Sequence, residues 1–186
     1  AIQSLLCYPQ WESISEPESA DITFAHQLVL HIGDDSISTE LLAEIMPEAE
    51  VSELASQAAT VAERFHQLSA QVFTAVHDLL AQGPTEPVLL QIACASGVEG
   101  RDLLAGINAL LQTAMQENPM LQGQFISYAD GETADGLARK LRANRHAVVP
   151  SCIRYQDGQR QLRCWKELDM ADSKPSKPWK QAGVYL

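Results

Sequence analysis

The chain has 186 residues, a net charge of −11 at pH 7, and a composition of 46% hydrophobic and 20% charged residues. This length fits one domain that buries roughly 70% of its unfolded surface, and the composition is that of an ordinary soluble globular protein. No apolar run approaches the ~20 residues that span a bilayer, and the first residues lack the pattern of a signal peptide, which excludes a membrane partner. We therefore expect a single domain over residues 1–186, located in the cytoplasm.

The charge is divided unevenly along the chain. Residues 1–100 contain fifteen acidic side chains and one basic side chain, Arg64, whereas residues 101–186 contain nine acidic and twelve basic side chains. The net charges of these parts are therefore −14 and +3. This acidic balance argues against nucleic acid as a partner, because binding to phosphates needs a basic surface. The C-terminal part can dock another molecule, although a solvated face is the simpler interpretation.

Cys7, Cys94, Cys152 and Cys164 lie far apart in the sequence and form no C-x-x-C pair. Each has apolar neighbours. We expect buried, reduced thiols, with no disulfide or metal-binding role.

The first part of the chain predicts a strand, a helix and a second strand. Residues 26–35 form an apolar run that ends in Gly-Asp-Asp, which indicates a buried strand and a turn. Residues 36–47 predict a short helix, with Ser36 or Ser38 as its N-cap and a proline at its end. A weaker strand is expected over residues 49–54.

The middle of the chain predicts two longer helices on either side of a strongly apolar strand. Residues 57–82 repeat apolar side chains every three or four positions, and a Gly-Pro pair ends this helix. Residues 86–96 are apolar on both faces, as in a parallel sheet that is covered on each side. Residues 100–118 predict another helix, which stops before a proline.

The C-terminal third predicts a strand, a helix and a β-hairpin. Residues 122–129 favour a strand, and residues 133–144 favour a helix capped by its first residue, a threonine. A strand over residues 146–155 runs into Asp157-Gly158 and returns through residues 159–165. An Asp-Gly pair in this position is typical of a two-residue type I′ turn.

The alternation of strands and helices predicts an α/β fold, in which a Rossmann-like parallel sheet is flanked by helices and followed by the C-terminal β-hairpin. Residues 169–186 are polar and proline-rich until Val184, and we expect them to be a linker. Val184–Leu186 has the pattern of a strand that is just beginning.

The glycine-rich fingerprint that binds a dinucleotide in a Rossmann fold is missing. The first predicted strand is followed by one glycine, Gly33, and then by Asp34 and Asp35, which would repel a phosphate. The turn over residues 97–100 has two glycines but places Glu99 between them. We therefore predict no cofactor-binding residue in this chain.

The sequence also lacks the motifs of common catalytic sites. It contains no G-x-S-x-G, no P-loop, and no tyrosine followed four residues later by lysine. The five histidines have no metal-ligand spacing and are expected to be packing or surface residues: His26, His31, His66, His77 and His146. We predict no catalytic and no metal-binding residue.

Three stretches resemble one family. They are residues 5–12, with an aromatic-Pro-x-Trp pattern, residues 103–126, and residues 153–168 together with the segment 178–186. In these stretches the chain resembles the structural subdomain that precedes the catalytic subdomain in ketoreductases of modular polyketide synthases, especially those of the trans-acyltransferase type. The similarity spans most of the chain and is most specific from Leu103 onward.

This resemblance implies a truncated Rossmann-like fold that has no cofactor of its own. NADPH and the catalytic residues would belong to the adjoining catalytic subdomain, which would begin with a strand like Val184–Leu186. The implied role is to stabilise and position this subdomain, which reduces a β-ketoacyl chain held by an acyl carrier protein. The partners would be the catalytic subdomain in cis and other polyketide synthase domains, including the acyl carrier protein.

The resemblance also implies an interface formed by the N-terminal segment and the hairpin 151–165. Aromatic side chains are enriched at protein interfaces. The candidate interface residues are Tyr8, Trp11, Tyr155, Trp165 and Tyr185. Trp11 and Trp165 can equally cap the core of this domain.

Two alternatives remain open at this stage. One is an autonomous small α/β enzyme, in which Ser96 or Cys94 is the nucleophile, although the sequence places no base beside either. The other is an interaction module that docks a carrier protein or an acyltransferase through the acidic N-terminal half.

Overall fold

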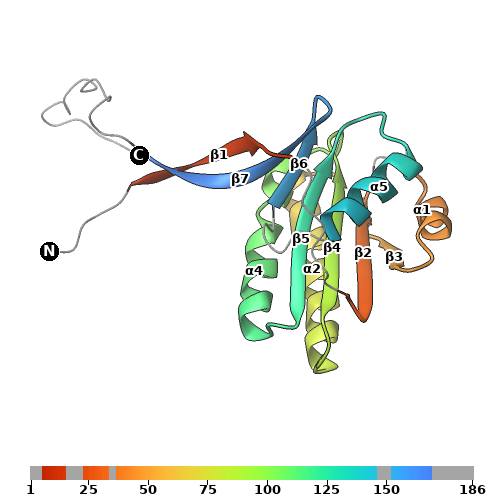
Figure 1. Ribbon diagram of the computed structural model, residues 1–186. Helices are drawn as coiled ribbons and strands as arrows, with labels where there is room; N and C mark the ends of the chain where they lie inside the picture. The colour runs from red at the N-terminus through yellow and green to blue at the C-terminus, as the bar shows by residue number, and fades with distance from the viewer. Residues whose placement is uncertain (1–5, 16–22, 34–36, 146–151, 169–186) are drawn as a thin grey trace, which may run out of the picture.

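The computed structural model describes residues 6–15, 23–33, 37–145 and 152–168 (Figure 1). In these residues a seven-stranded sheet is combined with five helical segments. In chain order, the elements are β1 Cys7–Ser13, β2 His26–Ile32, α1 Thr39–Ile45, β3 Glu50–Glu53, α2 Val61–Ala81, β4 Val88–Ala95, α3 Arg101–Leu104, α4 Ile107–Glu117, β5 Leu121–Tyr128, α5 Ala134–Arg145, β6 Cys152–Gln156 and β7 Gln159–Glu167.

The strands lie in the order β1-β7-β6-β5-β4-β2-β3. The five strands from β3 to β6 in this order run parallel, which confirms the predicted Rossmann-like α/β core. β7 pairs antiparallel with β6, and β1 pairs antiparallel with β7. The sheet is therefore mixed: the predicted hairpin adds β7 antiparallel to β6, and β1 is a seventh strand that was not predicted.

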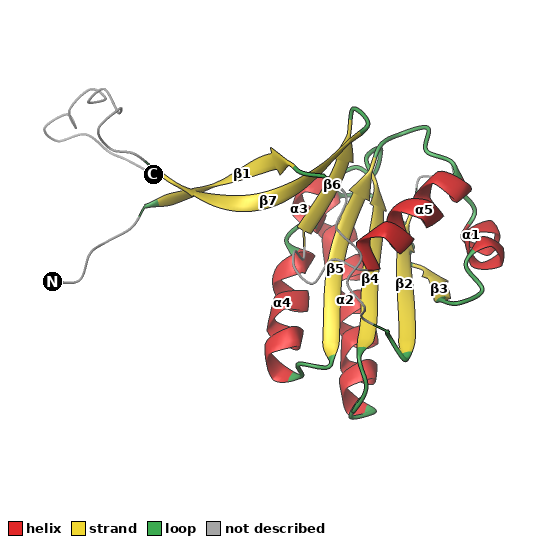
Figure 2. Ribbon diagram, in the orientation of Figure 1, coloured by secondary structure: helices red, strands yellow, loops and turns green. Residues whose placement is uncertain are grey.

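Helices cover both faces of the parallel strands (Figure 2). Side chains of α2, α3 and α4 pack with one set of strand residues, and those of α1 and α5 pack with the other set. β4 lies near the centre, and all eight of its residues are buried. This burial on both faces is the reason for its continuous apolar sequence.

Side-chain caps fix the starts of three helices. Ser38 Oγ accepts a hydrogen bond from the amide of Leu41, which confirms Ser38 as the N-cap of α1. Thr60 caps α2 in the same way, so this helix begins at Val61, four residues later than predicted. Thr133 Oγ1 accepts from the amide of Gly136 and caps α5, as predicted.

Two predicted elements differ from the structure. The helix expected over residues 100–118 is divided into α3 and α4, because Gly106 donates to the carbonyl oxygen of Leu103 and closes a tighter turn. β6 begins at Cys152, whereas the strand was predicted from His146, which lies outside the described residues. The linker prediction for residues 169–186 also lies outside them.

The turn between β6 and β7 has the predicted geometry. Asp157 and Gly158 have φ values of 52° and 73°, so both central residues are left-handed, as a type I′ turn requires. In the described part of the chain, no helix is both long and apolar enough to cross a bilayer.

Candidate protein interface on the β1–β7 ribbon

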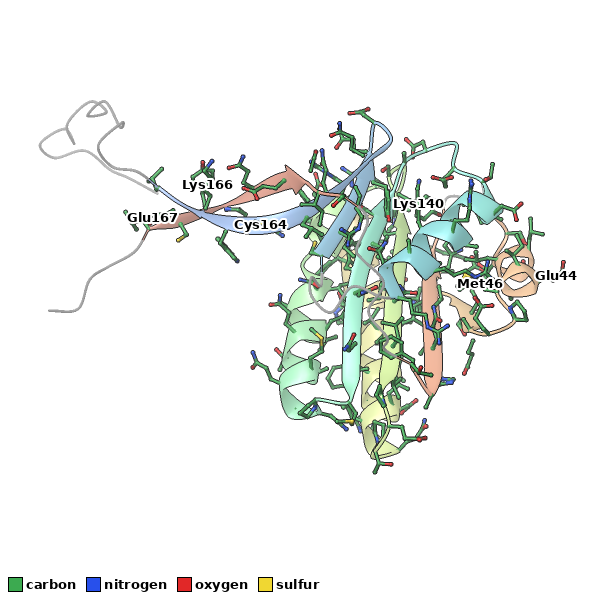
Figure 3. All side chains as sticks on the ribbon, in the orientation of Figure 1. Glu44, Met46, Lys140, Cys164, Lys166 and Glu167 are labelled. Atoms are coloured by element: carbon green, nitrogen blue, oxygen red, sulfur yellow. The ribbon has the colours of Figure 1, made fainter. Side chains whose placement is uncertain are left out.

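The outer part of the sheet is a two-stranded ribbon that extends beyond the helices (Figure 1). β6 pairs with β7 only over Gln159–Leu162, whereas β1 pairs with β7 as far as Glu167. We call residues 7–11 of β1 and 163–167 of β7 the ribbon. Figure 3 places Cys164, Lys166 and Glu167 on this ribbon, away from the body of the domain. An isolated two-stranded ribbon is marginally stable in water, so we expect another surface to cover it.

The register assigns the ribbon side chains to two faces, because directly opposed residues of an antiparallel pair lie on the same side. The tryptophan face contains Cys7, Pro9, Trp11, Arg163, Trp165 and Glu167. The tyrosine face contains Tyr8, Gln10, Cys164 and Lys166, and it continues into Leu6 and Leu168, which are joined by a backbone hydrogen bond.

Both faces expose large apolar side chains. The side chain of Trp165 is 72% exposed on the tryptophan face, whereas Leu6, Tyr8 and Leu168 are 56%, 41% and 43% exposed on the other face. A strand that carries apolar residues on both faces is typical of a strand buried on both sides. Apart from Trp11, which packs against the core, the large side chains of the ribbon are left exposed by the described residues of this chain.

The outer edge of β1 carries a proline that disfavours the addition of another strand. Leu6 and Ile14 make backbone hydrogen bonds to the strand opposite, so the odd-numbered residues of β1, including Pro9, direct their backbone groups outward. Proline has no amide hydrogen to donate at this edge. Pro9 therefore favours docking of the ribbon through its side chains over the addition of another strand.

Trp11 lies where the ribbon meets the body. It is half-buried and packs against the core cluster that α2, α3 and α4 form with the sheet. The guanidinium of Arg154 lies 4.3 Å from the centre of its ring and donates two hydrogen bonds to Gln161 Oε1. Trp11 therefore caps this domain's own core, as the alternative interpretation of the sequence allowed.

Tyr155 does not reach the surface. It is 6% exposed and its hydroxyl accepts a hydrogen bond from Asn144 Nδ2, because its strand position directs it toward α5. This corrects its proposed contact role: Tyr155 supports the ribbon from inside the domain. Tyr8 and Trp165 are exposed as an interface requires, and Tyr185 lies outside the described residues.

A buried polar network anchors the ribbon where it joins the body of the domain, and no sequence pattern indicated it. Asn144, at the end of α5, accepts a hydrogen bond from Arg160 Nε at 2.9 Å, and Arg160 also donates to the carbonyl oxygen of Ser15. Arg160 is the second residue of β7, and Ser15 lies just beyond β1. The network therefore links both strands of the ribbon to the helix layer.

The burial of two cysteines also differs from the prediction. Cys94 and Cys152 are buried, but Cys7 is exposed and Cys164 is half-exposed, because both of these lie on the ribbon. All four are free thiols. Burial raises the pKa of the Cys152 thiol, although the positive charge of Arg163 opposes this effect.

In a Rossmann fold, a dinucleotide binds in the crevice at which the strand order reverses. In this chain, that crevice lies between the carboxyl ends of β2 and β4. Here a pocket of about 290 Å³ is lined by Glu53, Arg64 and Glu99. Arg64 donates to the Glu99 carboxylate at 3.0 Å, so the one cation in this lining is already paired. The N-terminus of α1 is capped by Ser38, whose hydroxyl donates to the Glu40 carboxylate.

These groups do not fit a dinucleotide. A pyrophosphate needs free backbone amides and a positive or neutral surface, whereas this crevice presents carboxylates and a self-capped helix of seven residues. That the chain has no cofactor-binding residue stays a prediction, which a binding measurement would test.

The candidate nucleophiles of the enzyme alternative are poorly placed for catalysis. Cys94 is completely buried, and the hydroxyl of Ser96 donates to the carbonyl oxygen of Tyr128 at 2.7 Å. His31, which is also buried, contacts Thr39 Oγ1 and the hydroxyl of Tyr128 through its two ring nitrogens. Among the described residues, no three histidine, cysteine or acidic side chains are grouped as metal ligands.

No protein-family model matches the chain. Over 185 residues, 99% of its length, it is 32% identical to polyketide synthase PksN of Bacillus subtilis (strain 168). Over 127 residues, 68% of its length, it is 34% identical to polyketide synthase PksL of the same organism. The chain spans only about 3% of the length of each of these relatives.

Solved structures of ketoreductases share the fold. A ketoreductase domain from the bacillaene assembly line matches with a TM-score of 0.74 at 21% identity, over 89% of this chain and 39% of that one. A-type ketoreductases from a modular polyketide synthase match with a TM-score of 0.54 at 14% identity, over 92% of this chain and 44% of that one. The chain is therefore related to the polyketide synthases, and its fold is that of a part of their ketoreductase domains.

Proposed function

We propose that this chain is a non-catalytic structural subdomain of a polyketide synthase ketoreductase. Its ribbon would dock against an adjoining catalytic half, which would bind NADPH and reduce a β-ketoacyl chain on an acyl carrier protein. The observation that carries this proposal is the ribbon itself, which exposes Trp165 on one face and Tyr8, Leu6 and Leu168 on the other. The matched ketoreductases support it, because this chain covers less than half of each of them.

The role of the chain would be to hold and position the catalytic half. The parallel strands and their helices pack into two buried cores, and the network around Arg160 and Asn144 ties the ribbon to this body. Docking side chains on a rigid element limits the entropy that is lost on association. The crevice that would bind a dinucleotide is lined by Glu53 and Glu99, and for this reason the proposal assigns NADPH binding to the adjoining half.

A comparison of two proteins tests this proposal through Trp165. One protein is the isolated chain, and the other is a longer polypeptide in which the residues encoded after Leu186 continue the chain. In the isolated chain, Trp165→Ala should leave the unfolding midpoint unchanged, because the side chain is largely exposed. In the longer polypeptide it should destabilise by about 2–4 kcal/mol, as expected for a tryptophan at the centre of an interface.

Phe73→Ala is the matched control for this comparison. Phe73 is 58% exposed on α2, on the body of the domain and away from the ribbon. Its substitution should have the same small effect in both proteins. If Trp165→Ala also has equal effects in the two proteins, the ribbon is not the docking surface and the proposal is contradicted.

A further inference from the structure

Three arginines from different elements gather beside Trp11, and we call them the arginine cluster. Arg154 of β6 lies over the indole ring, and Arg163 of β7 is directly opposite Trp11 in the register. Arg101, at the start of α3, is close enough for its charge to act on Arg154. The charge of Arg163 also acts on the buried Cys152 thiol, which shows that Arg163 lies near the point where the ribbon joins the body of the domain.

This positive charge is only partly neutralised by the chain. Arg101 pairs with Asp102 at 3.1 Å, and the Asp102 side chain is 92% exposed. Asp157 acts on Arg154 only through space. In the described ranges, no ion pair joins Arg154 or Arg163 to a carboxylate. Burial and the neighbouring charge of Arg101 lower the pKa of Arg154, because both make the charged form of its guanidinium less favourable.

The position of the cluster suggests what could neutralise it. Arg163 and Trp165 are two residues apart on the tryptophan face, and Pro9 lies opposite Trp165. A partner that covers the exposed indole of Trp165 would therefore lie beside Arg163 on the same face. Guanidinium groups at interfaces prefer planar carboxylates, which can accept two parallel hydrogen bonds.

We propose that Arg154 and Arg163 bind a carboxylate of the adjoining half, from an aspartate or glutamate that faces the tryptophan face of the ribbon. This proposal rests on the proposed function, and it adds the chemistry of the partner surface. The apolar contact at Trp165 would supply most of the affinity, whereas the arginine–carboxylate contact would fix the orientation of the two halves. Such a contact weakens as salt increases.

The test uses Arg163→Gln, which removes the charge but keeps a polar side chain at an exposed position. Unfolding midpoints are measured for the isolated chain and for the longer polypeptide, at about 50 mM and about 500 mM NaCl. In the longer polypeptide, the substitution should lower the midpoint by about 3 °C at low salt, and by less than half of this at high salt. The isolated chain should change by less than about 1 °C. Arg154→Gln with Arg163→Gln should enlarge the difference between the two proteins.

Arg139→Gln is the control, because Arg139 is exposed on α5, which covers the opposite face of the sheet. It should cause no difference between the two proteins. If Trp165→Ala destabilises the longer polypeptide alone while Arg163→Gln resembles Arg139→Gln, the carboxylate contact is refuted and the docking role survives. Equal losses in both proteins for Arg163→Gln would show that the chain's own acids neutralise the cluster, which also overturns this proposal. If neither substitution distinguishes the two proteins, both proposals fail.

Discussion

Asn144 is the residue whose removal should most weaken the root of the ribbon. Its side chain makes three hydrogen bonds: Nδ2 donates to the Tyr155 hydroxyl and to the Lys140 carbonyl oxygen, both at 2.8 Å, and Oδ1 accepts from Arg160 Nε at 2.9 Å. Asn144 is completely buried and Arg160 is 5% exposed. Water therefore cannot replace these contacts unless the site opens.

The expected loss for Asn144→Ala is about 3 kcal/mol. Each hydrogen bond contributes about 1 kcal/mol net, and the bond to the charged guanidinium contributes more, because its loss deprives a buried charge of an acceptor. The better helix propensity of alanine returns about 0.5 kcal/mol. For a domain of this size, such a loss corresponds to a decrease of about 6–12 °C in Tm.

Urea unfolding of the isolated chain, followed by circular dichroism, measures this loss. Asn108→Ala is the matched control, because Asn108 is also in a helix and its Oδ1 has no hydrogen-bond partner among the described residues. A double-mutant cycle with Arg160→Met should give a coupling energy above about 1 kcal/mol. Additive effects, or a loss for Asn144→Ala no larger than that of the control, would refute the network as the anchor of the ribbon.

Two further predictions concern ionisable groups. Burial raises the pKa of the Cys152 thiol, whereas Cys7 is exposed, so iodoacetamide should label Cys7 much faster than Cys152 at pH 8. Mass spectrometry follows the two labelling rates, and equal rates would contradict the burial of Cys152. The hydrogen bond from Arg142 lowers the pKa of Glu48 in the folded state. This pair therefore stabilises the fold at pH values above the unfolded carboxyl pKa of about 4.5, and the stabilisation is lost as the pH falls through the lower pKa of the folded state. Glu48→Gln should therefore cost about 0.5 kcal/mol at pH 7 and progressively less as the pH falls below the folded pKa of Glu48. A cost that is constant with pH would exclude the ion pair as its cause.

The parallel core was predictable because its signals are local. The apolar run of β4 follows from burial on both faces, and the apolar stripe of α2 repeats with the helical period. The Asp157-Gly158 turn follows from the conformations that two residues of a type I′ turn require.

β1 was not predictable as a strand, because its stability comes from a partner more than 140 residues away in the sequence. Cys7–Ser13 contains a proline and no apolar alternation, and it is held by the ladder to β7. This pairing brings Tyr8 and Trp165, which are far apart in the sequence, onto one ribbon, where they lie on opposite faces. The two faces of the ribbon could only be assigned once the register was known.

Buried hydrogen bonds between polar side chains could not be predicted from the sequence either. Gln91 lies in the middle of the apolar β4, where it accepts a hydrogen bond from Gln27 and donates one to Gln124. Arg160 and Asn144 have the polarity of surface residues and are nevertheless buried. Periodicity assigns such residues to solvent, and only their partners across the fold explain their burial.

The central claim is that this chain supports a reductase without binding its cofactor, and NADPH titration by isothermal calorimetry tests it most directly. The isolated chain should give no binding heat. The longer polypeptide, which adds the residues encoded after Leu186, should bind one NADPH and reduce a β-ketoacyl thioester. Binding of NADPH by the isolated chain, or reduction of the thioester by that chain alone, would contradict the account.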